Sequence, residues 1–436
     1  MSVQNESSSS SSSSPLATKK KRIDLPEGTI AISIGLMIAG LTIYAFFKIG
    51  QQALGQDGFK PLVSLWFVMF ALAPGFFLPV EQEISRAIAH RRALGQGAWP
   101  VVRKVLILCL IIVVVLIAMI AALAPFVNDN LFEGNGIVTA SLAIAIAVYG
   151  VFYIIKGLCS GLGKFNSYGF IVGADGAVRV VVCLILLIAG VTQLGAYALV
   201  VVLTPLVGIL IILFSGQLKM EDGPPATWSE ITPNLGLLLG GSIFAAALVN
   251  AGPITVALLG DTAPAEQVTL FGNAVLLTRV PLFLFQAVQA ALLPRLTRLA
   301  ARGDIKEFRS GFKQLVILVF GVGLLGIVGA FIVGPNVLDL VYGGSIDRRT
   351  ITLLALASGI YMMALAIAQA VIALNGHKHV AIGWSLAFLT YVVIVWLVSN
   401  DLFLRVEIAL VASSVVGLIS FATSLRSQLR SSSPTF

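Results

Sequence analysis

The 436-residue chain is 58% hydrophobic and 11% charged, whereas an average soluble domain carries about 25% charged residues. Too few charges remain to cover a water-facing surface of this size, which excludes a soluble enzyme, a disordered chain and a fibrous chain. The composition is typical of polytopic membrane proteins, whose helices each need about 20 apolar residues to cross the hydrocarbon core. The net charge of +8 then indicates basic cytoplasmic loops rather than nucleic-acid binding.

The first 27 residues differ from the rest of the chain. A serine run, Ser7–Ser14, cannot bury apolar surface, so residues 1–27 are expected to form a disordered tail. The basic cluster Lys19–Arg22 comes directly before the first apolar segment and predicts a cytoplasmic tail that contacts anionic membrane lipids. That first apolar segment is too long for a cleavable signal peptide.

Twelve long apolar segments follow, and we interpret them as membrane-spanning helices of an all-α polytopic protein. They cover residues 28–50, 60–81, 103–126, 136–158, 168–190, 194–216, 232–258, 266–292, 314–335, 350–375, 380–398 and 404–425. An even number of spans puts both termini on one side of the membrane, and most Lys and Arg residues then fall on that side. Basic residues mark the cytoplasmic side, so the sequence predicts a cell (inner) membrane protein with cytoplasmic termini.

An internal repeat divides the twelve spans into halves. Three residues that close the third span recur at the end of the ninth, at near-constant offsets of 210, 210 and 209 positions: Pro125, Asp129 and Gly134 match Pro335, Asp339 and Gly343. Six spans per repeat give halves of parallel topology. We therefore expect a six-helix lobe at 28–216, a cytoplasmic linker at 217–231, a second six-helix lobe at 232–425 and a cytoplasmic tail at 426–436.

The loops argue for transport rather than catalysis. Every loop on the expected outer side is short, and the sequence contains neither a cluster of acids and histidines for acid–base chemistry nor a metal or nucleotide motif. No cofactor and no metal are therefore expected. Two equivalent helical lobes with little chain outside the membrane are the build of an alternating-access transporter.

Charged residues inside the spans are costly and mark candidate functional sites. Asp175 and Arg179 are four residues apart near the middle of the fifth span, so they share a helix face and can form an ion pair. Arg279 of the eighth span is not neutralised by an acid on its own helix, and Gln286 and Gln289 lie on or near its face. We expect the two arginines to line a wet cavity and bind a phosphate or diphosphate, to which guanidinium binds bidentately. The alternative for Asp175 and Arg179 is a purely structural ion pair.

The cytoplasmic ends of the second and fourth spans carry further charges. Glu81, Glu83 and Arg86 could form a gate between the lobes, although a solvated helix end explains them too. Lys156 and Lys164 could attract an anionic headgroup at the cytoplasmic mouth, and anchoring to the cytoplasmic side explains them equally well.

Uncharged polar residues within the spans could hydrogen-bond sugar hydroxyls, although hydrogen bonds between helices are their commoner use. They are Tyr149, Tyr153, Asn250, Asn273, Tyr361 and Gln369.

Three segments carry a family resemblance. Residues 279–296 with 300–304 resemble the eighth span and following loop of the polysaccharide and lipid II flippases of the multidrug/oligosaccharidyl-lipid/polysaccharide exporter superfamily. Residues 77–86 are similar to the end of the second span in actinobacterial-type oligosaccharide flippases, and 374–376 fit the end of the tenth span. The resemblance implies a V-shaped pair of lobes that moves a polyprenyl-diphosphate-linked oligosaccharide to the outer leaflet for cell-surface polysaccharide synthesis. It also implies a glycan polymerase or glycosyltransferases as partners.

Two departures from the lipid II flippases favour a generic polysaccharide flippase. The first span has no basic residue before Lys48, and Arg279 lies closer to Pro281 than the corresponding basic residue of those proteins does. Two alternatives stay open. One is a multidrug/cation antiporter of the same superfamily, which typically has an acid in the first or seventh span; 28–47 and 232–258 contain none. The other is a polytopic enzyme acting on lipid-linked glycans.

Overall fold

The computed structural model describes residues 28–231, 235–260, 264–283, 285, 299 and 305–431. Over these residues the chain forms helices and loops without strands, as expected of an all-α protein. The helices are α1 (Thr29–Ala93), α2 (Trp99–Ala122), α3 (Ala124–Leu131), α4 (Gly136–Gly161), α5 (Phe165–Ile188), α6 (Leu194–Leu203), α7 (Pro205–Phe214), η1 (Trp228–Glu230), α8 (Leu235–Leu259), α9 (Ala265–Thr278), α11 (Ile305–Tyr342), α12 (Arg348–Ala373), α13 (His377–Leu397) and α14 (Leu402–Ser431).

Ten helical segments in the described part of the chain are long and apolar enough to cross a membrane. They account for the predicted spans with two differences. The first two spans are joined in α1, and the predicted span 266–292 runs past the end of α9 beyond the described residues. The sixth span is divided into α6 and α7 at Pro205, which cannot donate a backbone hydrogen bond. The prediction of an all-α, multi-pass membrane protein is confirmed.

Helix α1 is a hairpin of two arms that meet at Gly55. The backbone there is left-handed (φ 73°), a conformation that glycine adopts without steric cost. The rings of Phe46 and Trp66 are 5.5 Å apart between centroids, whereas twenty residues of straight helix would separate them by about 30 Å. The two arms therefore lie antiparallel. We call the end of the molecule near Gly55 the Gly55 end, and the opposite end, where segment 217–231 lies, the linker end.

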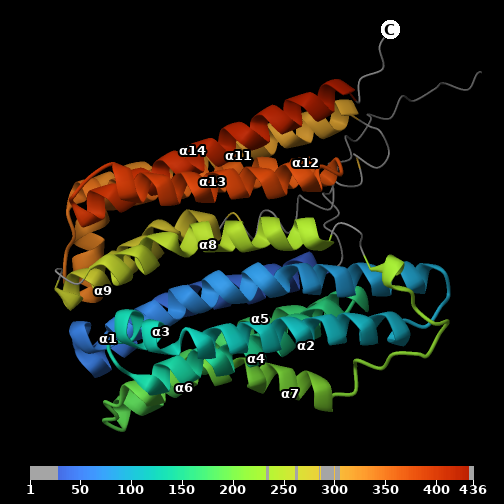
Figure 1. Ribbon diagram of the computed structural model, residues 1–436, viewed down its shortest axis with the longest axis horizontal. Coiled ribbons are helices and arrows are strands. Elements are labelled where there is room, and N and C mark those ends of the chain that lie inside the picture. Colours follow the sequence, from blue (N-terminus) through green and yellow to red (C-terminus); the bar gives the residue numbers. More distant parts are fainter. Residues whose placement is uncertain are drawn as a thin grey trace, which may run out of the picture.

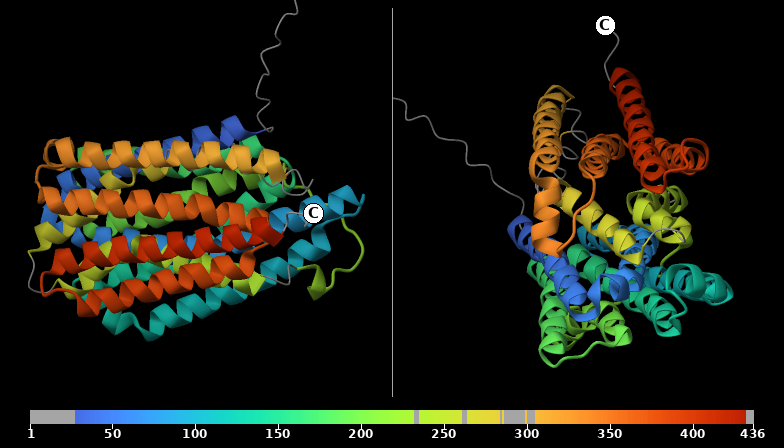
Figure 2. Two further views of the ribbon diagram at one scale, coloured as in Figure 1. Left: turned by 90° about the horizontal axis from the view of Figure 1, so that it is seen from above. Right: turned by 90° about the vertical axis from the view of Figure 1, so that its left-hand side faces the viewer.

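The helices fall into two groups. In Figure 1, α1–α7 form one layer and α8–α14 form the other, with segment 217–231 running between them at the linker end. Figure 2, viewed from the side, shows that α8 lies between α1 and the outer helices α13 and α14, whereas the end of α11 reaches α1. We refer to α1–α7 as the N-lobe and to α8–α14 as the C-lobe.

Segment 217–231 is fastened to the N-lobe. Arg91 forms an ion pair with Glu230 (Nη2–Oε2, 2.7 Å) and donates to the carbonyl of Pro224, and the backbone N–H of Trp99 donates to the carbonyl of Glu221. The backbone N–H of Thr227 and the guanidinium of Arg91 lower the pKa of Glu230 below its ordinary value, so its charge persists to more acidic pH than that of an ordinary glutamate. Segment 217–231 is therefore part of the N-lobe's packing up to Glu230.

Neutral hydrogen bonds join the two lobes toward the Gly55 end. Gln51 donates to the side-chain oxygen of Asn273 (2.9 Å), and Tyr44 donates to the carbonyl of Leu276 (3.0 Å). The backbone carbonyl of Gln56 accepts a hydrogen bond from the hydroxyl of Thr269 (2.9 Å), and the side-chain amide of Gln56 donates to the carbonyls of Tyr342 and Gly343. In the described residues no ion pair crosses between the lobes. The hydrogen bonds at the Gly55 end can therefore break without separating opposite charges in a low dielectric.

Within the N-lobe, α1 and α5 approach each other at two glycines. A Cβ atom built on Gly169 would lie 2.2 Å from the carbonyl oxygen of Ala31, and one built on Gly35 would lie 2.2 Å from the carbonyl oxygen of Gly169. The obstructing atoms are backbone, so a side chain can be accommodated only if the helices separate. Small residues at such crossings are how membrane helices obtain close packing.

Replacing Gly169 with Ala is therefore expected to lower the free energy of unfolding by about 1–3 kcal/mol, the usual cost of overpacking. Thermal unfolding of the purified protein in detergent measures the effect. The matched control is Gly329→Ala in α11, where an added Cβ meets no atom within 4 Å. An equal midpoint for G169A and G329A would contradict the assignment of this crossing.

Candidate cavity between the lobes

A cavity of about 340 Å³ lies between the lobes. Its walls come from both arms of α1 and from α8, α9, α12 and α13. They are mainly apolar and aromatic, and they include Trp66, Phe70, Phe283, Tyr361 and Trp384. The lining extends from Arg279 to Gln82 and His377 near the linker end, whereas the hydrogen bonds described above close the Gly55 end.

Arg279 is the basic group deepest in this cavity, and its side chain is only 9% exposed. It donates to the side-chain oxygen of Asn250 (Nη1–Oδ1, 3.3 Å) and to the carbonyl of Val249. Its guanidinium carbon also lies 5.3 Å from the centre of the Phe67 ring, in the opposite lobe. No Asp or Glu is present in the described lining of the cavity. The charge is therefore held by amide, carbonyl and aromatic groups alone.

A break in α9 presents this arginine. The N–H of Arg279 donates to the carbonyl of Leu276 (3.0 Å), a tighter turn than an α-helix, and the hydroxyl of Thr278 donates to the vacated carbonyl of Val275 (3.0 Å). Pro281 follows two residues later and has no N–H to donate to the next turn. Arg279 thus sits at a one-residue interruption of the helix, and helical backbone resumes at 280–283, where the N–H of Phe283 donates to the carbonyl of Arg279 (3.1 Å).

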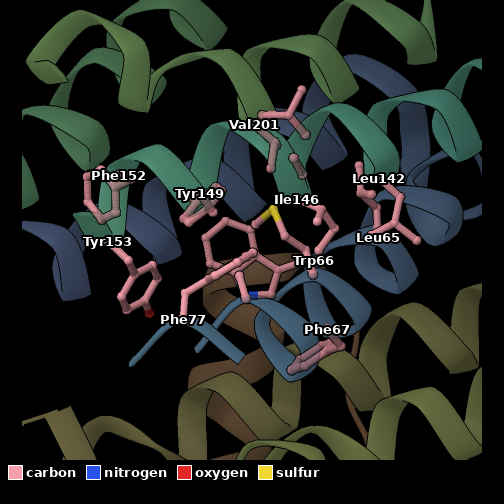
Figure 3. Packing of buried hydrophobic residues seen from close by; sticks show 14 of the residues in the cluster. Leu65, Trp66, Phe67, Phe77, Leu142, Ile146, Tyr149, Phe152, Tyr153 and Val201 are labelled. Atoms are coloured by element: carbon pink, nitrogen blue, oxygen red, sulfur yellow. The ribbon is translucent and has the colours of Figure 1, made fainter. Parts of the chain in front are cut away.

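Arg179 and Asp175 form the ion pair expected from their spacing, but they lie inside the N-lobe. Arg179 is 2% exposed, and Thr204 donates to the other oxygen of Asp175 (3.0 Å). The guanidinium carbon of Arg179 lies 5.0 Å from the centre of the Trp66 ring, and Trp66 itself lines the cavity. Figure 3 shows Trp66 on the side of α4, with Phe67 pointing the opposite way.

The structure therefore differs from the expectation of two arginines in one cavity. Arg279 lines it, whereas Arg179 and Asp175 do not. The two guanidinium groups pack on different sides of α1, because Arg179 contacts Trp66 and Arg279 contacts Phe67. A diphosphate contact of Arg179 stays a prediction. Gln286 and Gln289 lie outside the described residues.

Glu81 and Lys156 form a second buried ion pair in the N-lobe (Oε2–Nζ, 2.8 Å). Glu81 is 6% exposed and Lys156 is 8% exposed. Tyr168 donates to the second oxygen of Glu81 (2.8 Å), and the ammonium lies 4.2 Å from the centre of the Tyr153 ring. The two residues were expected in separate roles, at a gate and at a cytoplasmic mouth, but the structure pairs them in the protein interior.

The remaining charges lie at the linker end, where Glu83 is buried (2% exposed) and Arg86 is partly exposed. Arg86 binds Glu83 through two hydrogen bonds (3.0 and 2.5 Å) and donates to the carbonyl of Glu230. This links the end of α1 to segment 217–231, which leads into the C-lobe, and gating by the pair stays a prediction. Lys164 is exposed at the start of α5.

Several cavity residues were not singled out as site residues from the sequence. Asn250, Tyr361 and Gln369 were known only as polar residues within spans, and Trp66, Gln82 and His377 carried no signal that separated them from other residues of their helices. Their common feature is that they face the opposite lobe, which is a property of helix packing rather than of sequence pattern. Cys109, Cys159 and Cys183 are buried and unpaired.

Solved structures with a similar arrangement identify the fold. An inward-facing multidrug resistance MATE family transporter of the MOP superfamily matches with a TM-score of 0.69 and 16% sequence identity, covering 93% of this chain and 100% of that one. The chain has the MATE transporter fold. A point mutant of the Vibrio cholerae MATE transporter VcmN is also similar in structure, with a TM-score of 0.68 and 16% sequence identity, covering 92% of this chain and 97% of that one.

A third solved structure comes from Pyrococcus furiosus and is described under the words "reverse polarity of binding pocket suggests different function of a MOP superfamily transporter". Its structure is similar to that of this chain with a TM-score of 0.67 and 15% sequence identity, covering 92% of this chain and 96% of that one.

Sequence comparison gives relatives without a stated activity. Uncharacterised proteins of Mycobacterium tuberculosis (Rv3630 of strain H37Rv) and Mycobacterium bovis (Mb3654) are each 24% identical over 374 residues, covering 83% of both chains. No family model matches the chain. The functional argument therefore depends on the geometry of the cavity within a MATE fold.

The Glu81–Lys156 pair generates a stability prediction. Glu81→Gln leaves a buried ammonium without its carboxylate, and we expect a loss of about 3–5 kcal/mol in unfolding free energy, as for other broken buried ion pairs. The double variant E81Q/K156M removes both charges and is expected to recover most of that loss. Lys164→Met, at an exposed lysine on the neighbouring helix turn, is the control. Unfolding midpoints in detergent measure all three, and equal midpoints for E81Q and K164M would refute the buried pair.

Proposed function

We propose that this protein is an alternating-access flippase that moves a polyprenyl-diphosphate-linked oligosaccharide from the inner to the outer leaflet. The observation that carries the proposal is Arg279. A buried guanidinium without a carboxylate in the described lining of a membrane cavity has the chemistry of an anion site. Cell-surface polysaccharide synthesis is the process that such a carrier serves.

The free donors of Arg279 support a phosphate ligand. Guanidinium has five N–H donors, and two are used by Asn250 and Val249. The remaining donors can bind phosphate oxygens in bidentate geometry, and the group stays charged in a low dielectric. The diphosphate of the carrier lipid would lie at Arg279, at the deep end of the cavity.

The other cavity walls suit the rest of the substrate. Gln82 and Gln369 supply polar groups for sugar hydroxyls, and the aromatic rings of Trp66 and Trp384 provide flat apolar surfaces. A volume of about 340 Å³ lies within the usual range for small-ligand sites. It is too small for a polyprenyl chain, which would stay in the bilayer.

The closure of the Gly55 end supports alternating access. Its hydrogen bonds are neutral and join α1 to α9 and α11, while the cavity lining reaches the linker end. With the linker end cytoplasmic, as the distribution of basic residues predicts, the cavity faces the inner leaflet. Substrate would enter there and leave after the Gly55 end opens.

A second candidate, a multidrug antiporter, has one observation in its favour. The fold is that of MATE multidrug transporters, and the aromatic walls of the cavity would accept flat aromatic drugs. Arg279 opposes a cationic drug electrostatically, because no acid in the described lining offsets it.

Replacing Arg279 with Gln is expected to reduce export at least about tenfold, since it removes charge-assisted hydrogen bonds to the diphosphate. The measurement uses a strain lacking the protein, from which polyprenyl-linked glycans are extracted and assigned to a leaflet. Wild type should clear a lipid-linked oligosaccharide from the cytoplasmic face, and R279Q should not.

Lys313→Gln, at an exposed lysine of α11, is the charge-matched control and should export normally. Full export by R279Q at equal membrane level would refute the role of Arg279. If the strain accumulates no lipid-linked glycan and instead becomes sensitive to cationic dyes, the antiporter candidate replaces the flippase.

A further inference from the structure

A second, smaller cavity lies behind Arg279, inside the C-lobe. It has a volume of about 30 Å³ and is lined by residues of α8, α9, α12 and α14 together with Arg279 and Leu282. Arg279 and Tyr361 line both this cavity and the larger one between the lobes. A cavity of roughly 10–15 Å³ already suffices for one water, so this one has room for a single small ion or a water molecule.

Two hydroxyl groups in this cavity have no hydrogen-bond partner among the described residues. They belong to Ser358 of α12 and Ser414 of α14, and Ser414 is only 3% exposed. By contrast, the hydroxyls of Thr278 and Tyr361 already donate to the carbonyls of Val275 and Ala245. Ser414 is buried and Ser358 is half-buried. The two serines come from different helices and line the same small space.

The charge of the cavity selects the sign of its ligand. Arg279 contributes a full positive charge, and the described lining contains no Asp or Glu. A cation would meet repulsion without compensation, whereas an anion would neutralise a buried guanidinium and accept hydrogen bonds from both serines. The volume excludes phosphate and carboxylate ligands and leaves a monatomic anion.

We propose that this cavity is a halide site, occupied by chloride held between Arg279, Ser358 and Ser414. The ion neutralises Arg279 on the side facing away from the interlobe cavity and fixes the guanidinium at the deep end of that cavity. The proposal depends on the surroundings of Arg279 and not on what the larger cavity carries.

The test uses the purified full-length protein in detergent at constant ionic strength, with sodium gluconate replaced stepwise by sodium chloride or bromide. An anion that binds the folded state raises the unfolding temperature in a saturable way. We expect this halide-dependent rise in the wild type. For the double variant S358A/S414A we expect an apparent halide affinity at least about tenfold weaker, the loss of a hydrogen bond to a charged group.

Ser413→Ala is the matched control, because Ser413 is the buried neighbour of Ser414 and donates to the carbonyl of Leu410 instead of lining the cavity. It should keep the wild-type halide affinity. Equal affinities for S358A/S414A and S413A, or no halide dependence in the wild type, would overturn the site and leave a water in its place.

A second measurement avoids dependence on unfolding. Chloride-35 NMR line broadening reports the bound ion directly in the folded protein. Excess broadening by wild type that is lost in S358A/S414A and kept in S413A supports the proposal, and broadening that is the same in all three overturns it. Export assays are not involved, so failure of this site and failure of the flippase proposal are separate results.

Discussion

The buried charge of Arg279 is the constraint around which the centre of the molecule is organised. A guanidinium without a carboxylate partner is costly inside a membrane protein, and here it is held by the side chain of Asn250, the carbonyl of Val249 and the ring of Phe67. The regular part of α9 also ends at Arg279, two residues before Pro281. An interrupted helix and an uncompensated charge together mark a place that packing alone would not produce.

The two lobes treat charge differently. In the N-lobe, Arg179 is paired with Asp175 and Lys156 with Glu81, and aromatic rings cover both cations. These pairs are complete within the lobe and hold its helices together. Among the described residues of the C-lobe, Arg279 keeps donors without partners toward one cavity and lines another with the hydroxyls of Ser358 and Ser414. The repeat that relates the halves of the sequence therefore does not extend to their chemistry.

The contacts between the lobes are suited to being broken. Amide, hydroxyl and carbonyl groups close the Gly55 end, and Asn250 and Ser242 donate to carbonyls of α1 deeper in the interface. Neutral hydrogen bonds contribute about 0.5–1.5 kcal/mol each, so a few of them can give way to new contacts in an alternative conformation. Segment 217–231 is held to the N-lobe through Arg91.

The sequence by itself determined the membrane class, the span pattern and the pairing of Asp175 with Arg179, because hydropathy, span length and helical spacing are local properties. It also marked Arg279, since a charge within an apolar span is visible without a structure. It could not decide which side of α1 each arginine faces, or that Glu81 reaches Lys156. Those relations join residues far apart in the chain, and only the packing of the helices fixes the distances between them.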